Sequence, residues 1–255
     1  MHARRIAIAL ALFAIAGAPA GAAEIKALIS TAMKAPFQDI AAQFEKATGH
    51  KVAAAYGPTG NLAKRIASDE MVDLVILGGG QTGELTKQGK IAAGSTTDIA
   101  RAMIGTGVAK GAPKPDISSE AAFKAALLNA KSIAVTDAAG GGSSGIYFAK
   151  LFVQMGIAEA LKPRLKLAAG GAEGYAGTFV VKGEAEFALQ PIPELMAVPG
   201  IEVVGPLPGA FQNVTTYRAS IPASAKEPDA AKALIKLLAA PSAADIYKAK
   251  GFEPG

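Results

Sequence analysis

The chain has 255 residues, with 26 basic and 21 acidic side chains, no cysteine, no tryptophan and two histidines. The absence of cysteine excludes disulfides and thiol nucleophiles, and His50 is the only histidine that follows the N-terminal segment, which argues against a His-based triad or a His-rich metal site. No run of lysine and arginine is interleaved with aromatic residues, so we expect no nucleic-acid partner. We also expect no cofactor and no metal ligand.

The first 23 residues have the pattern of a cleavable secretory signal. Residues 1–5 form a basic leader, residues 6–16 a short apolar run, and residues 18–23 supply small side chains of the A-x-A kind. We expect cleavage after Ala22 or Ala23, and the short run disfavours the alternative of an uncleaved membrane anchor. No cysteine is present to carry a lipid, so the mature protein should be soluble in the periplasm rather than a lipoprotein; an extracellular destination stays open.

After the signal, about 232 residues remain, which is enough for one large domain or two small lobes. Residues 25–30 are predicted to form a buried strand, followed by a helix whose inward face is Phe37, Ile40, Ala41 and Phe44. A strand at 52–56, a helix at 61–68 and a strand at 73–77 complete two βα units, which favour a parallel sheet.

The turn Gly57-Pro58-Thr59-Gly60 lies between the second strand and its helix. Its glycines allow the backbone to approach a ligand, and the Thr59 hydroxyl with the free N–H groups of the helix start would form a cluster of donors. Such a cluster holds a small anion or polar solute without a catalytic group. The alternative is that Thr59 only caps its helix.

The second half continues the alternation after a turn-rich linker at 111–116, and it contains no repeat of the first half. A Gly- and Ser-rich segment at 137–144 opens a helix whose apolar face includes Phe148, Phe152 and Met155, with Gly156 at its end. Ser143 and Ser144 either face a ligand or cap this helix. The other predicted elements are helices at 121–129 and 175–182, strands at 132–136, 165–168, 187–189, 202–204 and 214–219, and two C-terminal helices. The first of these C-terminal helices is expected to pack inward through Ala231, Leu234, Ile235 and Leu238.

In α/β sheets, ligands bind at the carboxyl ends of strands, where the helices begin. The loops after Ser30, Tyr56 and Thr136 are three such places, and each carries hydroxyl groups. Three hydroxyl-bearing strand-to-helix turns predict a shared binding site more strongly than one.

The order and spacing of several segments resemble the periplasmic solute-binding proteins of ABC importers, and among them the molybdate-binding type. The matching segments are Gln38–Glu45, Gly57–Ile66, Val72–Ile76, Ser144–Lys150, Lys182–Glu186 and Lys250–Pro254. The resemblance covers nearly the whole mature chain. It implies an α/β fold of class II periplasmic binding protein type, with two lobes, each a mainly parallel sheet flanked by helices. Lobe 1 would comprise residues 24–107 and 208–255, and lobe 2 residues 108–207.

The resemblance also implies pocket positions. The second hydroxyl of the family falls on Thr59, beside Gly60, while the first falls on Ala32, which leaves Ser30 or Thr31 to replace it. Backbone donors fall near Ser144 and near Glu173, and the tyrosine of the family falls on Pro191. The ligand-binding residues expected from the resemblance and from the residues near it are Ser30, Thr31, Thr59, Gly60, Ser143, Ser144, Gly145, Glu173, Tyr175 and Gln190.

These changes indicate that molybdate is not the best ligand, since a buried dianion needs donors for nearly every oxygen. Gln190 offers an acceptor as well as donors, which suits a small oxyanion or a hydroxy-, keto- or amide-bearing organic acid. Without Arg4 and Arg5, 24 basic residues face 21 acidic ones, so the mature net charge of +3 is compatible with an anion without demanding one. No arginine lies in the pocket loops to hold a bulky carboxylate.

We therefore expect a monomeric protein, not an enzyme, that captures a small anionic or polar solute for an ABC permease in the inner membrane. Two alternatives remain: a carboxylate-dependent hydrolase or isomerase on the same scaffold, and a binding protein that serves a sensor. His50 on a surface turn and Asp73 at a strand end have structural explanations, whereas Asp137 lies beside the second-half loop. The glycine-rich residues 78–83 lack the Gly-Lys-Ser/Thr ending of a nucleotide loop and are predicted to form a flexible connection.

Overall fold

The structure is a computed structural model, and it describes residues 21–169 and 174–255. The strands are β1 (Glu24–Ser30), β2 (Lys51–Gly57), β3 (Leu74–Gly78), β4 (Thr97–Ala109), β5 (Ile133–Thr136), β6 (Leu165–Ala168), β7 (Phe187–Pro191), β8 (Ile201–Pro206), β9 (Val214–Ser220) and β10 (Glu253–Pro254). The helices are α1 (Lys34–Thr48), α2 (Thr59–Ala67), α3 (Gln81–Lys87), α4 (Glu120–Asn129), α5 (Ser143–Gln154), α6 (Ala158–Leu161), α7 (Ala176–Val181), α8 (Ile192–Met196), α9 (Pro228–Leu238) and α10 (Ala244–Ala249). Short 3-10 turns lie at Thr31–Met33, Lys162–Arg164, Gly209–Phe211 and Pro241–Ala243. Nearly all of the predicted signal lies outside the described residues.

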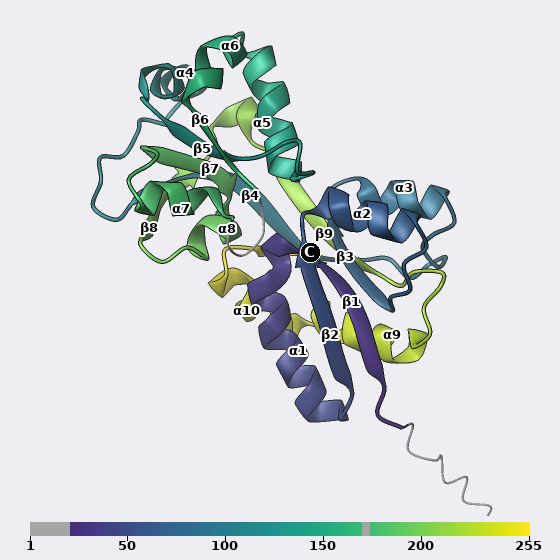
Figure 1. Cartoon of the computed structure of the whole chain (residues 1–255). Coiled ribbons are helices and arrows are strands. Elements are labelled where there is room, and N and C mark those ends of the chain that lie inside the picture. Colours follow the sequence, from purple (N-terminus) through teal and green to yellow (C-terminus); the bar gives the residue numbers. More distant parts are fainter. Residues whose placement is uncertain (1–20, 170–173) are drawn as a thin grey trace, which may run out of the picture.

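The molecule has two lobes, each an α/β layer structure, joined by the long strand β4 and the return segment before β9 (Figure 1). The sheet runs in the order β2-β1-β3-β9-β4-β7-β5-β6, with β8 and β10 also paired to β4. In lobe 1, β1 is parallel to β2 and β3; in lobe 2, β5 is parallel to β6 and β7. The predicted α/β fold class is confirmed, and antiparallel strands β4, β8 and β9 are added to the two parallel sets.

β4 belongs to both lobes. It pairs with β9 up to Met103 and with β7 from Ile104 onward, so the change of partner falls a few residues before the expected boundary at 107/108. Gln212 bridges the two connecting segments at this point, because its Oε1 accepts from Ile104 N at 3.0 Å and its Nε2 donates to Ile104 O at 3.0 Å. The connection between the lobes is therefore hydrogen-bonded across both segments.

Each lobe has its own hydrophobic core on both faces of its sheet. In lobe 1, alternate strand residues pack against α1, α9 and α10 on one face and against α2 and α3 on the other. In lobe 2, α4, α5 and α6 cover one face, and α7 and α8 cover the other. The predicted inward faces of α1 and α9 are buried. This packing fixes the strand ends where the loops emerge.

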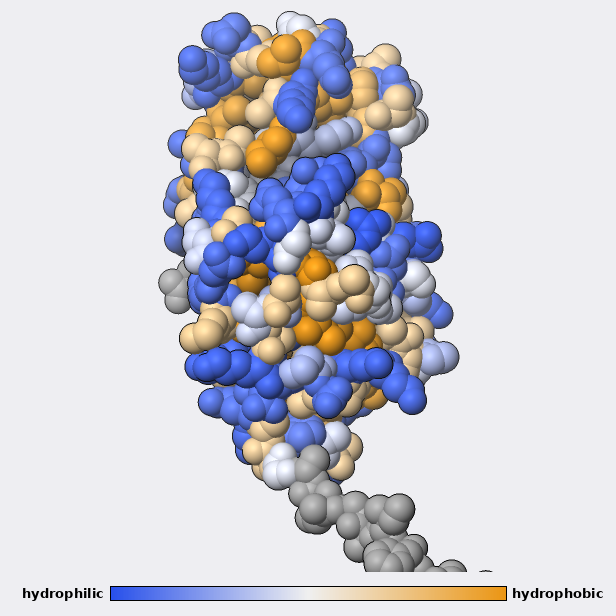
Figure 2. Space-filling model, turned by 90° about the vertical axis from the view of Figure 1, so that its right-hand side faces the viewer, coloured by the Kyte–Doolittle hydropathy of each residue, from blue (hydrophilic) through white to orange (hydrophobic). Residues whose placement is uncertain are grey.

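The surface is mainly hydrophilic on the face that carries α2 and α3, where hydrophobic residues gather only in a limited central area (Figure 2). The exposed large hydrophobic side chains among the described residues occur singly along the chain, at Met71, Leu128, Ile146, Val153, Leu167, Val181, Met196 and Val214. Within residues 21–169 and 174–255, no helix is long and apolar enough to cross a membrane.

One prediction about the loops is wrong. The glycine-rich segment at 78–83 is not a flexible connection, because β3 extends to Gly78 and α3 begins at Gln81 after a two-residue turn. The short turn is possible because Gly79 has φ of 69°, in the left-handed region that favours glycine. Three of the segment's glycines therefore end a strand, make a turn and precede a helix.

Candidate functional site

The strand-to-helix turns of the two lobes meet at one small cavity. Its volume is about 20 Å³, and its walls come from β1, α2 and β9 of lobe 1 and from β5, α5 and α8 of lobe 2. The lining residues are Ser30, Thr31, Pro58, Thr59, Thr136, Gly142, Ser143, Ser144, Glu194 and Tyr217. Hydroxyl groups dominate this set, and it contains no lysine or arginine.

On the lobe 1 side, Thr59 connects the ends of two strands. Its Oγ1 donates to Ser30 Oγ at 3.0 Å and accepts from Gly78 N at 3.3 Å. Thr59 is not a helix cap, because Pro58 occupies the N-cap position of α2 and makes no side-chain capping bond. Beside it, Thr31 Oγ1 is buried and has no hydrogen-bond partner among the described residues. A buried hydroxyl without a partner is costly, and a hydrogen bond to a ligand atom would remove that cost.

On the lobe 2 side, Thr136 accepts hydrogen bonds from two neighbours. Ser144 Oγ donates to its Oγ1 at 3.2 Å, and Gln190 Nε2 donates at 3.3 Å, which leaves the Thr136 hydroxyl proton free to donate elsewhere. The N-cap of α5 is Gly142 and makes no side-chain bond, so Ser143 and Ser144 are not caps either. The first N–H groups of this helix therefore need partners at the lobe interface.

The carboxyl group of Glu194 is the one acidic group among the lining residues. Burial raises the pKa of Glu194 to about 7, although the hydrogen bond that Gln190 Nε2 donates to its Oε2 at 2.6 Å acts in the opposite direction. Burial, and then the nearby charge of Glu194, also raises the pKa of Tyr175 and of Tyr217. Glu194 therefore gains and loses its proton near neutral pH, inside a ring of neutral donors.

The two lobes touch around this cavity. Gly60 N donates to Gly141 O at 3.2 Å, and Tyr175 OH lies 3.5 Å from Thr31 O, the outer limit for a hydrogen bond. A Cβ added at Gly60 would lie 2.9 Å from Gly141 O, so glycine permits this approach. These contacts describe a closed arrangement.

The structure brings five of the predicted side chains to the cavity: Ser30, Thr31, Thr59, Ser143 and Ser144. Tyr175 lies beside it, and Gln190 lies behind it, where Gln190 Oε1 accepts from Ala176 N at 2.8 Å. Gly145 has a packing role, because a Cβ there would clash with Thr136 O and lie 2.9 Å from Ala138 N. Glu173 lies outside the described residues.

Five lining residues were not among the predicted site residues: Pro58 and Gly142, which directly precede predicted ones, and Thr136, Glu194 and Tyr217. Thr136 ends a predicted strand, and the spacing Gln190 to Glu194 places both side chains on one side of a turn, so weak signals existed for these two. Tyr217 lies inside a predicted strand with no local feature that marks it.

Other titratable groups have structural roles. Asp73 accepts from the backbone N–H groups of Lys26, Lys226 and Glu227 at 2.8–2.9 Å. His50 stacks on Phe44 with ring centroids 5.7 Å apart, and its Nδ1 accepts from Ala23 N. In the described part of the chain, no three His, Cys, Asp or Glu residues are grouped as metal ligands would be.

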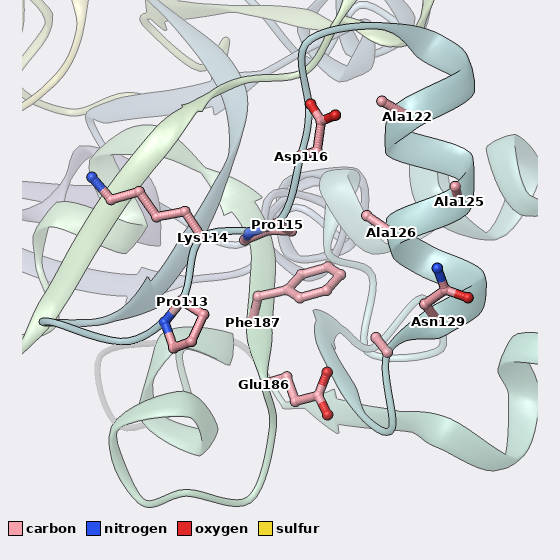
Figure 3. Close-up of a pocket in the computed structure, with 11 residues that line it drawn as sticks. Pro113, Lys114, Pro115, Asp116, Ala122, Ala125, Ala126, Asn129, Glu186 and Phe187 are labelled. Carbon is pink, nitrogen blue, oxygen red and sulfur yellow. The ribbon is translucent and has the colours of Figure 1, made fainter.

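A larger hollow of about 390 Å³ lies on lobe 2, between the segment at 113–116 and α4 (Figure 3). Phe187 points into it from the sheet, while Lys114 points away and pairs with Glu202 at 2.6 Å. Its other walls are mostly alanine and proline side chains, and they do not include both lobes. We therefore place the functional site at the smaller cavity, where polar groups converge.

Comparisons of the sequence and of the fold with known proteins indicate the same family. The sequence profile of a family described as bacterial extracellular solute-binding protein matches residues 25–253. A relative named aconitate isomerase, from Pseudomonas sp, is 33% identical over 264 residues, which cover 100% of this chain and 98% of that protein. The molybdate-binding protein ModA of Azotobacter vinelandii is 31% identical over 255 residues, covering 97% and 96% of the two chains.

Among solved structures, the periplasmic molybdate-binding protein of Azotobacter vinelandii aligns with a TM-score of 0.72 at 19% identity, covering 89% of this chain and 98% of that one. Two α/β lobes around a shared polar cavity define a solute-binding protein of the periplasmic type. This chain belongs to the bacterial extracellular solute-binding protein family, and it resembles the molybdate-binding members.

Proposed function

We propose that this protein binds a small carboxylic acid between its lobes, in the periplasm, after removal of its signal segment. Donors from both lobes surround Glu194, a carboxyl group that is neutral at mildly acidic pH. Delivery to an ABC permease of the inner membrane is the use that the family supports, and service to a sensor is the alternative. We take the protein to be a monomer with no nucleic-acid partner, and its lobes to divide within β4.

The ligand preference rests on Glu194. An ionised Glu194 repels any anion, whereas a protonated Glu194 donates one hydrogen bond. Molybdate, a tetrahedral dianion, needs donors on nearly every oxygen and has no proton of its own to give to an acceptor. An organic acid with a hydroxyl, keto or amide group matches a site that contains both donors and an acceptor.

Calorimetry with molybdate, tungstate, sulfate and a panel of small carboxylic acids tests this proposal. We expect a carboxylic acid to bind more tightly at pH 6 than at pH 8, because protonation of Glu194 removes the repulsion between its carboxylate and the ligand carboxylate. Submicromolar binding of molybdate that is lost in Thr59→Ala would contradict the proposal and restore the usual ligand of the molybdate-binding relatives.

A second candidate function is an isomerase acting on such an acid. The observation that favours it is the position of Glu194 inside the cavity with a pKa near 7, which suits a general base that removes a proton and returns it. The full-length similarity to a protein named aconitate isomerase points to the same chemistry. Moving a proton from one carbon of the acid to another leaves its atoms and electrons balanced, so the step needs no further reactant. Hydroxyl and N–H donors would stabilise the charge on the ligand carboxylate during the step.

Proton NMR with cis-aconitate or trans-aconitate in D₂O separates the two functions. An isomerase interconverts the two acids and incorporates deuterium, and Glu194→Gln abolishes both while acid binding persists. Binding without interconversion or deuterium incorporation would identify a solute-binding protein alone.

A further inference from the structure

The polar cavity is too small for the ligand that we propose. Its volume of about 20 Å³ is close to what a single water molecule needs. A carboxylic acid of several carbon atoms must therefore gain space, either by separation of the lobes or by entering an adjoining space.

A crevice of about 320 Å³ lies next to the cavity, also between the lobes. Its walls come from α1 and α10 of lobe 1 and from α8 of lobe 2, and the lining residues are Ala32, Ala35, Pro36, Tyr175, Pro193, Met196, Ala197, Ala249, Lys250 and Phe252. Most of these side chains are small or apolar, so the crevice suits the carbon chain of an acid.

The two spaces have neighbouring walls. Thr31 lines the cavity and Ala32 the crevice, and likewise Glu194 lines the cavity and Pro193 the crevice. Tyr175 is buried at the boundary and lines the crevice, while its hydroxyl lies 3.5 Å from Thr31 O. That contact is at the limit for a hydrogen bond, so little hydrogen-bond energy would be lost if the tyrosine side chain turned aside.

Lys250 is the only charged residue among those that line the crevice. Its Nζ lies 3.2 Å from Asp39 Oδ2, and the two side chains are 40% and 50% exposed. An ion pair this exposed contributes little, so a ligand carboxylate can compete with Asp39 for the ammonium group.

We propose that cavity and crevice form one two-part site for an acid with at least two carboxylates, one held among the hydroxyl groups and the other beyond Tyr175 near Lys250. This inference rests on the proposed function and narrows its ligand to di- and tricarboxylates. Tyr175 then separates ligands by length, since a short monocarboxylate has no group that reaches Lys250.

Calorimetry with succinate and butyrate tests the two-part site, because the two acids have the same chain length and differ at one end. We expect wild-type protein to bind succinate about threefold more tightly than butyrate, the modest gain that an exposed ion pair warrants. Lys250→Gln should remove this preference, and Asp39→Asn, which frees the ammonium group, should increase it. Lys248→Gln changes an exposed lysine of α10, the helix that ends just before Lys250, and this lysine does not line the crevice, so the ratio should stay unchanged.

The outcomes separate this inference from the proposed function. If succinate and butyrate bind equally, or if Lys250→Gln leaves the ratio unchanged, the two-part site is wrong while acid binding in the cavity stands. If neither acid nor tricarballylate binds the wild-type protein, the proposed function fails and the two-part site with it. Lys250 and Asp39 are half-exposed, so these variants should fold, and thermal unfolding checks that they do.

Discussion

Glu194 lies among neutral donors rather than beside a cation, and this sets its chemistry. A lysine or arginine in the lining would hold the carboxylate ionised, whereas Gln190 and the hydroxyl groups leave it close to its midpoint at neutral pH. Because burial disfavours the ionised carboxylate, ionisation of Glu194 lowers the free energy of unfolding, and the size of this loss depends on pH.

The ligand-free protein should become less stable as pH rises from about 4.5 to about 7. The folded pKa of Glu194, about 7, exceeds the ordinary value of 4.5, so the folded state keeps a proton that the unfolded state loses over this interval. The free energy of unfolding should fall by on the order of 3 kcal/mol and level off above pH 7. Urea denaturation across this range measures the fall.

Glu194→Gln should remove this part of the pH dependence, because an amide does not titrate. Glu184→Gln provides the control, since Glu184 is exposed on lobe 2 and should leave the fall intact. A wild-type stability that rises between pH 5 and 7 would mean that the Glu194 carboxylate is ionised and paired in the folded protein.

Thr59 should matter for stability as well as for binding. Thr59→Val keeps the shape but removes both the donor to Ser30 and the acceptor for Gly78 N, so we expect a loss of about 1–3 kcal/mol in unfolding free energy and weaker acid binding. Thr59→Ser retains the hydroxyl and should keep most of both. Equal behaviour of the two variants in urea denaturation and calorimetry would show that the hydroxyl is unimportant.

At the level of elements, the predictions succeeded where hydrophobic periodicity or a turn signal was clear. The inward faces of α1 and α9 and the strand–turn–helix at Thr59 were predicted because apolar spacing and glycine mark them. β4 was missed because Arg101 and two glycines, Gly105 and Gly107, interrupt any strand pattern. α8 was missed because it follows β7 directly and contains Pro193, which reads as a break.

The residues that line the site could be predicted only in part, because only some of them lie where a local sequence signal marks them. Ser30, Thr59 and Ser144 lie at strand-to-helix turns, which the chain order reveals. Glu194 and Tyr217 reach the cavity through tertiary packing of α8 and β9, which local sequence does not encode. The principal charge of the cavity therefore depends on how the two lobes meet.

The start of α5 depends on close contact with the end of β5. Gly145→Ala would drive a methyl group into Thr136 O and Ala138 N, which are backbone atoms that cannot turn aside. We expect a loss of at least about 3 kcal/mol in unfolding free energy. Gly83→Ala is the matched control, because nothing lies within 4 Å of its Cβ position in α3, and it should be neutral or stabilising by up to about 1 kcal/mol.

Chemical denaturation of both glycine variants provides the measurement. If Gly145→Ala were as stable as wild type, α5 would have to sit farther from β5 than the structure shows.

At the scale of the whole molecule, closure of the lobes should be sensitive to Gly60. Gly60→Ala places a methyl group 2.9 Å from Gly141 O only when the lobes are closed, so it should disfavour closure without disturbing either lobe. We expect weaker ligand binding with an almost unchanged melting temperature of the ligand-free protein.

Small-angle X-ray scattering follows the closure directly. The wild-type protein with saturating ligand should be more compact than without it, and Gly60→Ala should stay expanded at the same ligand concentration. An unchanged radius of gyration in the wild-type protein would contradict closure of the two lobes on the ligand.

The shared strand β4 also constrains how such a protein can diversify. Residues 97–103 of β4 complete the sheet of lobe 1, and residues 104–109 complete the sheet of lobe 2. If a gene encoded only one lobe together with the whole of β4, half of that strand would have no pairing partner, and the other lobe would lack its β4 strand. Exchange of whole lobes between relatives would require a break inside this strand. The two lobes should therefore be inherited as one unit. New ligand preferences should arise from point substitutions in the loops that line the site.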